Sequence, residues 1–186
     1  SMVFHLDEIM EPIYHRTGRH YATEPQPGGW NVVIERWPTG AGRDLTARRF
    51  LARPERKLYE GMNLLEQRRW LIEVAAAKDT VRRWLGETFD RPSFPVEVVL
   101  VPEGENRYRA VGDAIPEGHS PCITVSSVPW LSVAILGDGA FRDIEAVEVP
   151  EGTDPADAAA RAAAAVQARN PGAAVASTPA VTAILP

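Results

Sequence analysis

The stretch NLLEQRRWLIEVAAAKDTVRRWL, residues 63–85, decides the fold because it contains the longest periodic run of apolar residues in the chain. Its apolar residues recur at steps of four, three, four and three, the spacing of one face of an α-helix. Asn63 and Glu66 fit the capping-box pattern of a helix start, and Gly86 is expected to end the helix. We therefore predict one long amphipathic helix whose inward face comprises Trp70, Val74, Ala77, Val81 and Trp84.

Lys78 falls at the edge of this apolar stripe. A lysine in such a position usually packs its aliphatic stem against the protein and extends its ammonium group to water. We therefore expect the Lys78 side chain to reach solvent.

Runs of β-branched and aromatic residues on both sides of the helix predict strands. These runs cover residues 30–37, 94–101, 107–111, 123–125, 130–136 and 140–149. Shorter helices are expected after Asp44 and from Pro54, and an alanine-rich helix over residues 156–169. This order predicts an α+β fold with a mainly antiparallel sheet and one long helix packed across it.

The same patterns divide the chain into segments. Residues 1–28 are expected to form an N-terminal extension, because they are mixed in character and end in turn-forming proline and glycine. Residues 29–150 carry the predicted sheet and long helix, and residues 151–186 the alanine-rich helix and a tail.

Composition excludes several classes of protein. The chain has 186 residues, of which 45% are hydrophobic and 24% charged, as in globular proteins that bury a core. One cysteine and four histidines exclude a structural zinc finger, and a net charge of −5 argues against a general nucleic-acid binder. We expect a cytoplasmic protein without a membrane span, because no apolar run is long enough and no secretory signal is visible.

Charge is unevenly distributed along the chain. Residues 35–91 contain 13 basic and 9 acidic side chains, whereas residues 138–186 contain 3 basic and 7 acidic ones. Five of the basic residues flank the long helix: Arg53, Arg56, Lys57, Arg68 and Arg69. This cluster can bind a phosphate group or an acidic partner, or it can form an ordinary solvated helix surface, and the sequence leaves both open.

A pair of acidic residues, Asp143 and Glu145, lies in one of the predicted strands. Side chains two residues apart on a strand project to the same face, so these two carboxylates should lie side by side. Paired carboxylates suit a hard cation such as Mg²⁺, but they are also common on solvated strand faces.

Taken together, three stretches resemble the phosphopantetheinyl transferases of the surfactin-synthetase type, above all those associated with polyketide synthases. Residues 70–82, WLIEVAAAKDTVR, are similar to a characteristic helix of that family. Residues 123–134, ITVSSVPWLSVA, are similar to its strand–loop–strand segment, and Asp143-Ile144-Glu145 stands at the place of its Asp-x-Glu metal motif.

The resemblance implies a function in polyketide or fatty-acid biosynthesis. Members of the family use Mg²⁺ to transfer the 4′-phosphopantetheine arm of coenzyme A to a serine of an acyl carrier protein. It implies that Asp143 and Glu145 would hold Mg²⁺. The residues that would face the phosphates of coenzyme A are Arg53, Arg56, Lys57, Arg69 and Arg107.

The departures from the family pattern matter equally. Ser126 and Ser127 replace a histidine–serine pair, and no lysine follows Lys78, although the family's second half carries a lysine–glutamate helix. The chain thus resembles the first half of a pseudo-dimeric enzyme. It is expected either to be completed by a second copy or another chain, or to be a degenerate half-domain that binds a carrier protein or scaffolds a polyketide synthase. An unrelated α+β binding protein is the remaining alternative.

Overall fold

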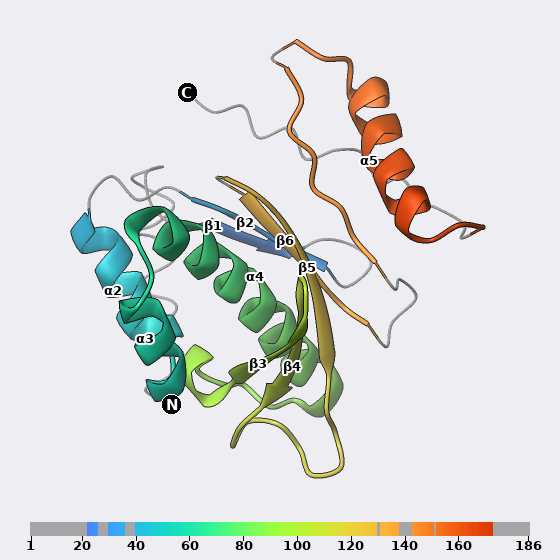
Figure 1. The fold of residues 1–186 in the computed structure, drawn as a ribbon. Helices are drawn as coiled ribbons and strands as arrows, with labels where there is room; N and C mark the ends of the chain where they lie inside the picture. The colour runs from blue at the N-terminus through green and yellow to red at the C-terminus, as the bar shows by residue number, and fades with distance from the viewer. Residues whose placement is uncertain are drawn as a thin grey trace.

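A computed structural model describes residues 22–25, 30–35, 40–129, 131–137, 143–150 and 152–172 of the chain, and these form an α+β fold (Figure 1). All neighbouring strands of its six-stranded sheet are antiparallel, in the order β1-β2-β6-β5-β4-β3. The strands are β1 (Ala22–Pro25), β2 (Trp30–Ile34), β3 (Val99–Gly104), β4 (Arg107–Val111), β5 (Cys122–Val128) and β6 (Leu131–Leu136). The predicted fold class and antiparallel sheet are confirmed.

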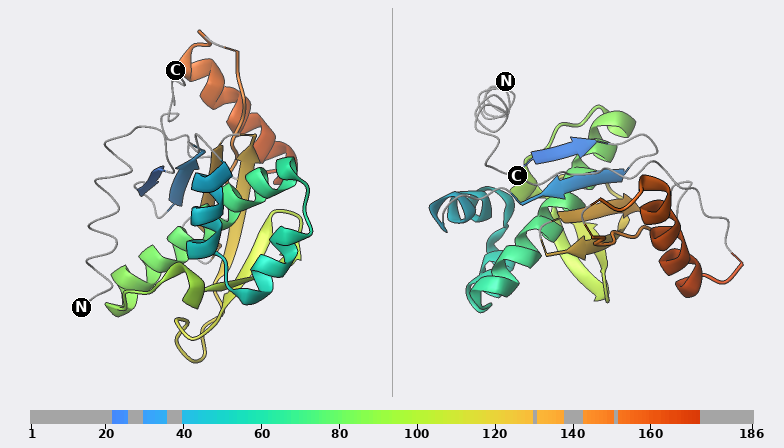
Figure 2. Two further views of the ribbon diagram at one scale, coloured as in Figure 1. Left: turned by 90° about the vertical axis from the view of Figure 1, so that its left-hand side faces the viewer. Right: turned by 90° about the horizontal axis from the view of Figure 1, so that it is seen from above.

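Helices lie on both sides of this sheet (Figures 1 and 2). On one side are α2 (Gly40–Phe50), α3 (Arg53–Glu60), the long α4 (Leu64–Phe89) and a 3₁₀ turn, η1 (Pro95–Glu97). On the other side lies α5 (Pro155–Arg169). No helix in the described segments is long and apolar enough to cross a membrane.

The start of α4 is fixed by the predicted capping box. The Asn63 side chain accepts hydrogen bonds from the backbone of Leu65 and Glu66, both at 3.0 Å, and Glu66 reaches back to the Asn63 N–H at 2.9 Å. The helix continues past Gly86, so the prediction of its end was wrong. It stops at Asp90, which adopts a left-handed conformation (φ 49°) and donates its N–H to the Gly86 carbonyl.

The core lies between α4 and the sheet. Val74, Ala77 and Val81 are fully buried, as the periodicity predicts, and Trp70 and Trp84 pack at the border of the core. The small side chains of residues 75–77 allow the helix backbone to approach the strands.

The Lys78 side chain is fully buried, so the prediction that it reaches solvent was wrong. Its Nζ donates to Glu55 Oε2 at 2.5 Å and to the carbonyls of Phe50 at 2.6 Å and Pro95 at 3.0 Å. The α2–α3 connection and η1 cover this edge of α4, which the periodicity of α4 alone does not reveal. Burial lowers the pKa of Lys78, and the neighbouring Glu55 carboxylate opposes that shift.

Other element boundaries also differ. Asp44 lies inside α2 instead of capping it, and η1 precedes β3 where one continuous strand was expected from residue 94. Residues 143–149 are extended but join no strand ladder, although a strand was expected there. Residues 22–25, placed by the sequence in an N-terminal extension, pair with β2 as an edge strand of the sheet.

Candidate functional site

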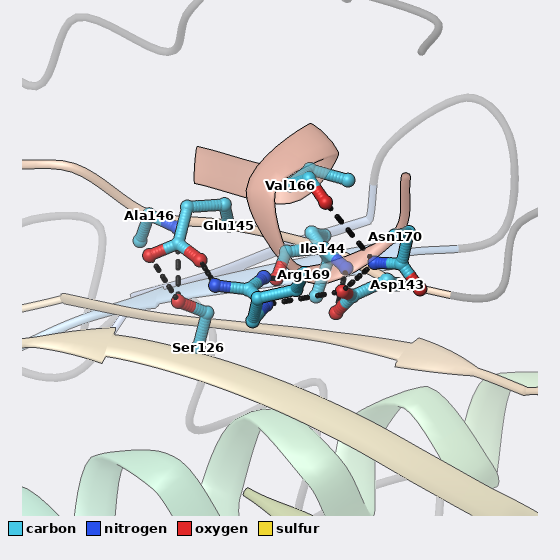
Figure 3. A network of polar contacts seen from close by, with 8 residues as sticks. All are labelled: Ser126, Asp143, Ile144, Glu145, Ala146, Val166, Arg169 and Asn170. Atoms are coloured by element: carbon cyan, nitrogen blue, oxygen red, sulfur yellow. Dashed lines mark hydrogen bonds and ion pairs between the residues drawn. The ribbon is translucent and has the colours of Figure 1, made fainter. Parts of the chain in front are cut away.

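Asp143 and Glu145 lie in an extended segment, residues 143–150, on the sheet face opposite α4 (Figure 3). Between them Ile144 packs, together with Ala146, against an apolar patch of the sheet made by Val32, Leu131 and Val133. Ile144 packs on the sheet, and the side chains of its two neighbours, Asp143 and Glu145, both contact the end of α5 (Figure 3). Their placement on a common side agrees with the expected alternation.

One arginine bridges the two carboxylates. Arg169, in the last turn of α5, forms ion pairs with Asp143 (Nε to Oδ2, 3.2 Å) and, through Nη1, with Oε2 of Glu145. Its Nη2 also donates to the Ile144 carbonyl at 3.3 Å. The guanidinium therefore lies where the two carboxylates converge.

The remaining carboxylate oxygens also have donors. Asn170, the C-cap of α5, donates its side-chain N–H to Asp143 Oδ2 at 2.7 Å, and the Ile144 N–H donates to Oδ1 at 2.9 Å. Ser126 on β5 donates its hydroxyl to Glu145 Oε1 at 3.3 Å. Each of the four carboxylate oxygens thus accepts at least one hydrogen bond.

The electrostatics of this cluster follow from those contacts. Partial burial favours the neutral form of Asp143, but the hydrogen bonds from Arg169 and Asn170 outweigh it and hold the pKa of Asp143 below its usual range. The Asp143 and Glu145 side chains are only 19% and 17% exposed, so their attraction to Arg169 is less screened than that of a surface pair. Two anions and one cation leave the cluster with one net negative charge.

The residues present do not fit Mg²⁺ in this arrangement. Magnesium requires several oxygen ligands in near-octahedral geometry, whereas here a guanidinium occupies the space between the carboxylates. Across the described residues, no group of three or more histidine, cysteine or acidic side chains is placed to hold a metal ion. A cation could reach Asp143 and Glu145 only if Arg169 moved away.

The basic residues singled out from the sequence are divided between the two sides of the sheet. Arg53, Arg56 and Lys57 lie on α3 and Arg69 on α4, all exposed and all on the side of the sheet away from the acidic pair. The Arg56 guanidinium is also held to the protein itself, through hydrogen bonds to backbone carbonyls at 2.9 and 2.6 Å.

Arg107 alone of this set shares the face of the acidic pair. It lies on β4 opposite Thr124 of β5, and Ser126, which binds Glu145, is the next residue of β5 on the same face. The structure therefore brings together Asp143, Glu145 and the face that carries Arg107, and it leaves the α3 and α4 cations elsewhere.

The residues that hold the acidic pair were not predicted from the sequence. Arg169, Asn170 and Ser126 are 19 to 27 positions away from the residues they bind, beyond the reach of any local pattern. One signal was present: Arg169 is one of only 3 basic residues after position 137, among 7 acidic ones.

A second polar cluster lies between α4 and the sheet and was also missed. The Tyr108 hydroxyl donates to Glu73 Oε1 at 2.5 Å, Ser127 hydrogen-bonds to the same carboxyl group, and Ser127 and Ser132 share a hydrogen bond of 2.6 Å. Burial raises the pKa of Glu73, and the hydrogen bonds from Tyr108 and Ser127 only partly oppose the shift. The pKa of Tyr108 is raised as well, by burial and by the Glu73 carboxylate.

Comparisons with protein-family models, with curated proteins and with solved structures find no match to this chain.

Proposed function

We propose that the chain is a phosphopantetheinyl-transferase-like half-domain that acts as a non-catalytic, carrier-protein-binding or structural module of a polyketide synthase. The observation that carries this proposal is the Arg169 bridge between Asp143 and Glu145. In a transferase of this kind the two carboxylates would bind a cation that meets the pyrophosphate of coenzyme A. Here they bind the end of α5, so their role is to attach that helix.

The distribution of the basic residues supports the same proposal. Stabilising a phosphoryl group during transfer requires several cations around one point. Arg53, Lys57 and Arg69 lie on the opposite side of the sheet from the acidic pair, so one copy of the chain does not assemble such a site within its described residues.

The proposal is tested by incubating the chain with coenzyme A, Mg²⁺ and an apo acyl carrier protein, then measuring the intact mass of the carrier. We expect no mass gain of a phosphopantetheine group even at high protein concentration. Co-migration of the carrier with the chain in native gels is expected if the module binds it. A mass gain that disappears in the Asp143→Ala variant would show instead that the acidic pair is catalytic.

A second candidate is an active transferase completed by a second copy or by another chain. It is favoured by one observation: the two carboxylates converge on a single positive charge, on the face that also carries Arg107. In that case Arg169 would have to leave the pair before Mg²⁺ and coenzyme A bind. Removing its guanidinium with Arg169→Ala should then raise the rate of transfer, whereas the non-catalytic module should show no transfer with either protein.

A further inference from the structure

Three leucines are exposed at the corner where α3 turns into α4. The relative exposures of Leu58, Leu64 and Leu65 are 53%, 67% and 55%, the three highest values among the exposed large hydrophobic residues. They fall within eight consecutive residues, on either side of the turn at Gly61. Adjacent exposed apolar side chains with a charged rim are typical of protein interaction surfaces.

This corner is held in place by its own contacts. The Gln67 side chain donates to the Tyr59 carbonyl at 3.0 Å, which joins the first turn of α4 to the end of α3. Tyr59 is buried and its ring lies 6.5 Å from that of Trp70, so the inner side of the corner is already filled. The three leucines lie on the outer side of this corner.

Exposed basic residues lie on the same two helices as the leucines. Arg53 and Lys57 lie on α3 and Arg69 one turn after Leu65 on α4, and all three are exposed. Within the described part of the chain none of the three forms an ion pair, whereas Arg68 beside them is paired with Glu35 at 2.6 Å. Two exposed acids, Glu60 and Glu66, only partly offset these charges, and Glu66 is engaged in capping α4.

We propose that this α3–α4 corner, residues 53–69, docks an amphipathic helix of an acidic partner protein. Leu58, Leu64 and Leu65 would contact an aliphatic ridge of that helix, and Arg53, Lys57 and Arg69 would pair with carboxylates along its flanks. The proposal goes beyond the proposed function, because it holds whether or not the chain acts with a carrier protein.

Charge and shape argue for this occupant over two others. A second copy offers only one acidic residue on α5, Asp157, beside two arginines, and the exposed apolar side chains of that helix are alanines, which provide no ridge to cover three leucines. The exposed large apolar residues of the corner include no aromatic side chain, the usual anchor at a lipid interface.

The test uses two synthetic helical peptides of about 20 residues, long enough for five helical turns. Both carry the same leucine ridge, but one has glutamate and the other lysine on its flanks. Binding to the full chain is measured by fluorescence anisotropy. We expect the glutamate peptide to bind, with an affinity that falls as salt is raised, and the lysine peptide not to bind.

Single substitutions locate the surface. Arg69→Glu and Leu65→Ser should each weaken binding of the glutamate peptide by at least about fivefold. Arg161→Glu, an exposed arginine on α5, should leave binding unchanged, and circular dichroism should show all three variants folded. Equal binding of the two peptides, no binding of either, or an equal loss with Arg161→Glu overturns the proposal. The proposal is also overturned if neither peptide binds and Leu65 is instead required for the chain to form a dimer or to bind anionic vesicles.

Discussion

Lys78 shows how much a single buried charge depends on its partner. The ammonium group has three oxygen acceptors and no contact with water, and Glu55 also accepts N–H groups from Ala52 at 2.6 Å and Leu100 at 2.9 Å. This pair connects α3, α4 and β3. A buried ion pair stabilises a fold no more than well-packed apolar residues of similar volume would. Removing one member, however, leaves the other charge buried without a partner, which strongly destabilises the fold.

We therefore expect Lys78→Met to lower the free energy of unfolding by about 3–5 kcal/mol. Adding Glu55→Gln should recover part of the loss, because a neutral amide oxygen still accepts the backbone N–H groups. Lys57→Met, an exposed lysine on the same helix as Glu55, should change stability by less than about 0.5 kcal/mol. Urea unfolding of the four proteins measures these values, and a Lys78→Met variant as stable as the Lys57→Met control would contradict the buried pair.

The buried environment of Glu73 predicts that the free energy of unfolding depends on pH. Its pKa is raised by burial, so the folded state holds this proton more tightly than the unfolded state does. The stabilising contribution is complete below the unfolded pKa of about 4.5 and is lost as pH rises through the folded pKa. The Glu73→Gln variant keeps an acceptor for Tyr108 but cannot ionise.

As pH rises above about 4.5, the unfolding free energy of the wild type should therefore fall relative to that of Glu73→Gln. Urea unfolding at a series of pH values gives this difference. If the wild type instead gains stability over the variant across that range, the Glu73 carboxylate is favoured by the fold and its assigned environment is incorrect.

At the level of whole elements, polar contacts join the last turn of α5 to the rest of the molecule. Arg169 and Asn170 bind Asp143, and Arg169 also binds Glu145. No apolar side chain of α5 belongs to either of the buried clusters found in the described residues. The polar contacts at its end should therefore control how often the helix separates from the sheet.

Arg169→Ala should speed backbone hydrogen–deuterium exchange across residues 155–169 while leaving exchange in α4 unchanged. Arg161→Ala serves as the matched control, because Arg161 lies on the same helix and is exposed. Because the pKa of Asp143 is lowered, its part of this attachment is present above the unfolded pKa of about 3.9 and lost as pH falls through the folded value. Unchanged exchange in Arg169→Ala would mean that other contacts hold α5.

The sequence predicts these elements unevenly, for physical reasons. The cap at Asn63, the inward face of α4 and the strands β5 and β6 depend on local patterns and are confirmed. The end of α4 was predicted wrongly, because Gly86 is accommodated inside the helix and the left-handed Asp90 caps it instead. The segment at residues 143–149 was predicted wrongly as a strand, because it pairs with no strand in the described part of the chain, which no local pattern reveals. The same is true of the site: alternation placed Asp143 and Glu145 together, but nothing local identified Arg169 as their partner.

At the scale of the whole molecule, the sheet separates two regions, the exposed cations of the α3–α4 corner and the acidic pair. The side with α2, α3 and α4 carries the exposed cations of the α3–α4 corner, and the other side carries the acidic pair and α5 (Figure 1). If the chain were a transferase by itself, coenzyme A would have to contact both regions at once. The proposed module requires only that each side bind its own partner.

The account depends on Arg169 occupying the place that a metal ion would take between the two carboxylates. Calorimetric titration of Mg²⁺ into the wild type and into Arg169→Ala tests this most directly. We predict no saturable binding to the wild type, and weak binding to Arg169→Ala that a further Asp143→Asn substitution removes. Saturable Mg²⁺ binding to the wild type, lost in Asp143→Asn and unaffected by Arg169→Ala, would contradict the account.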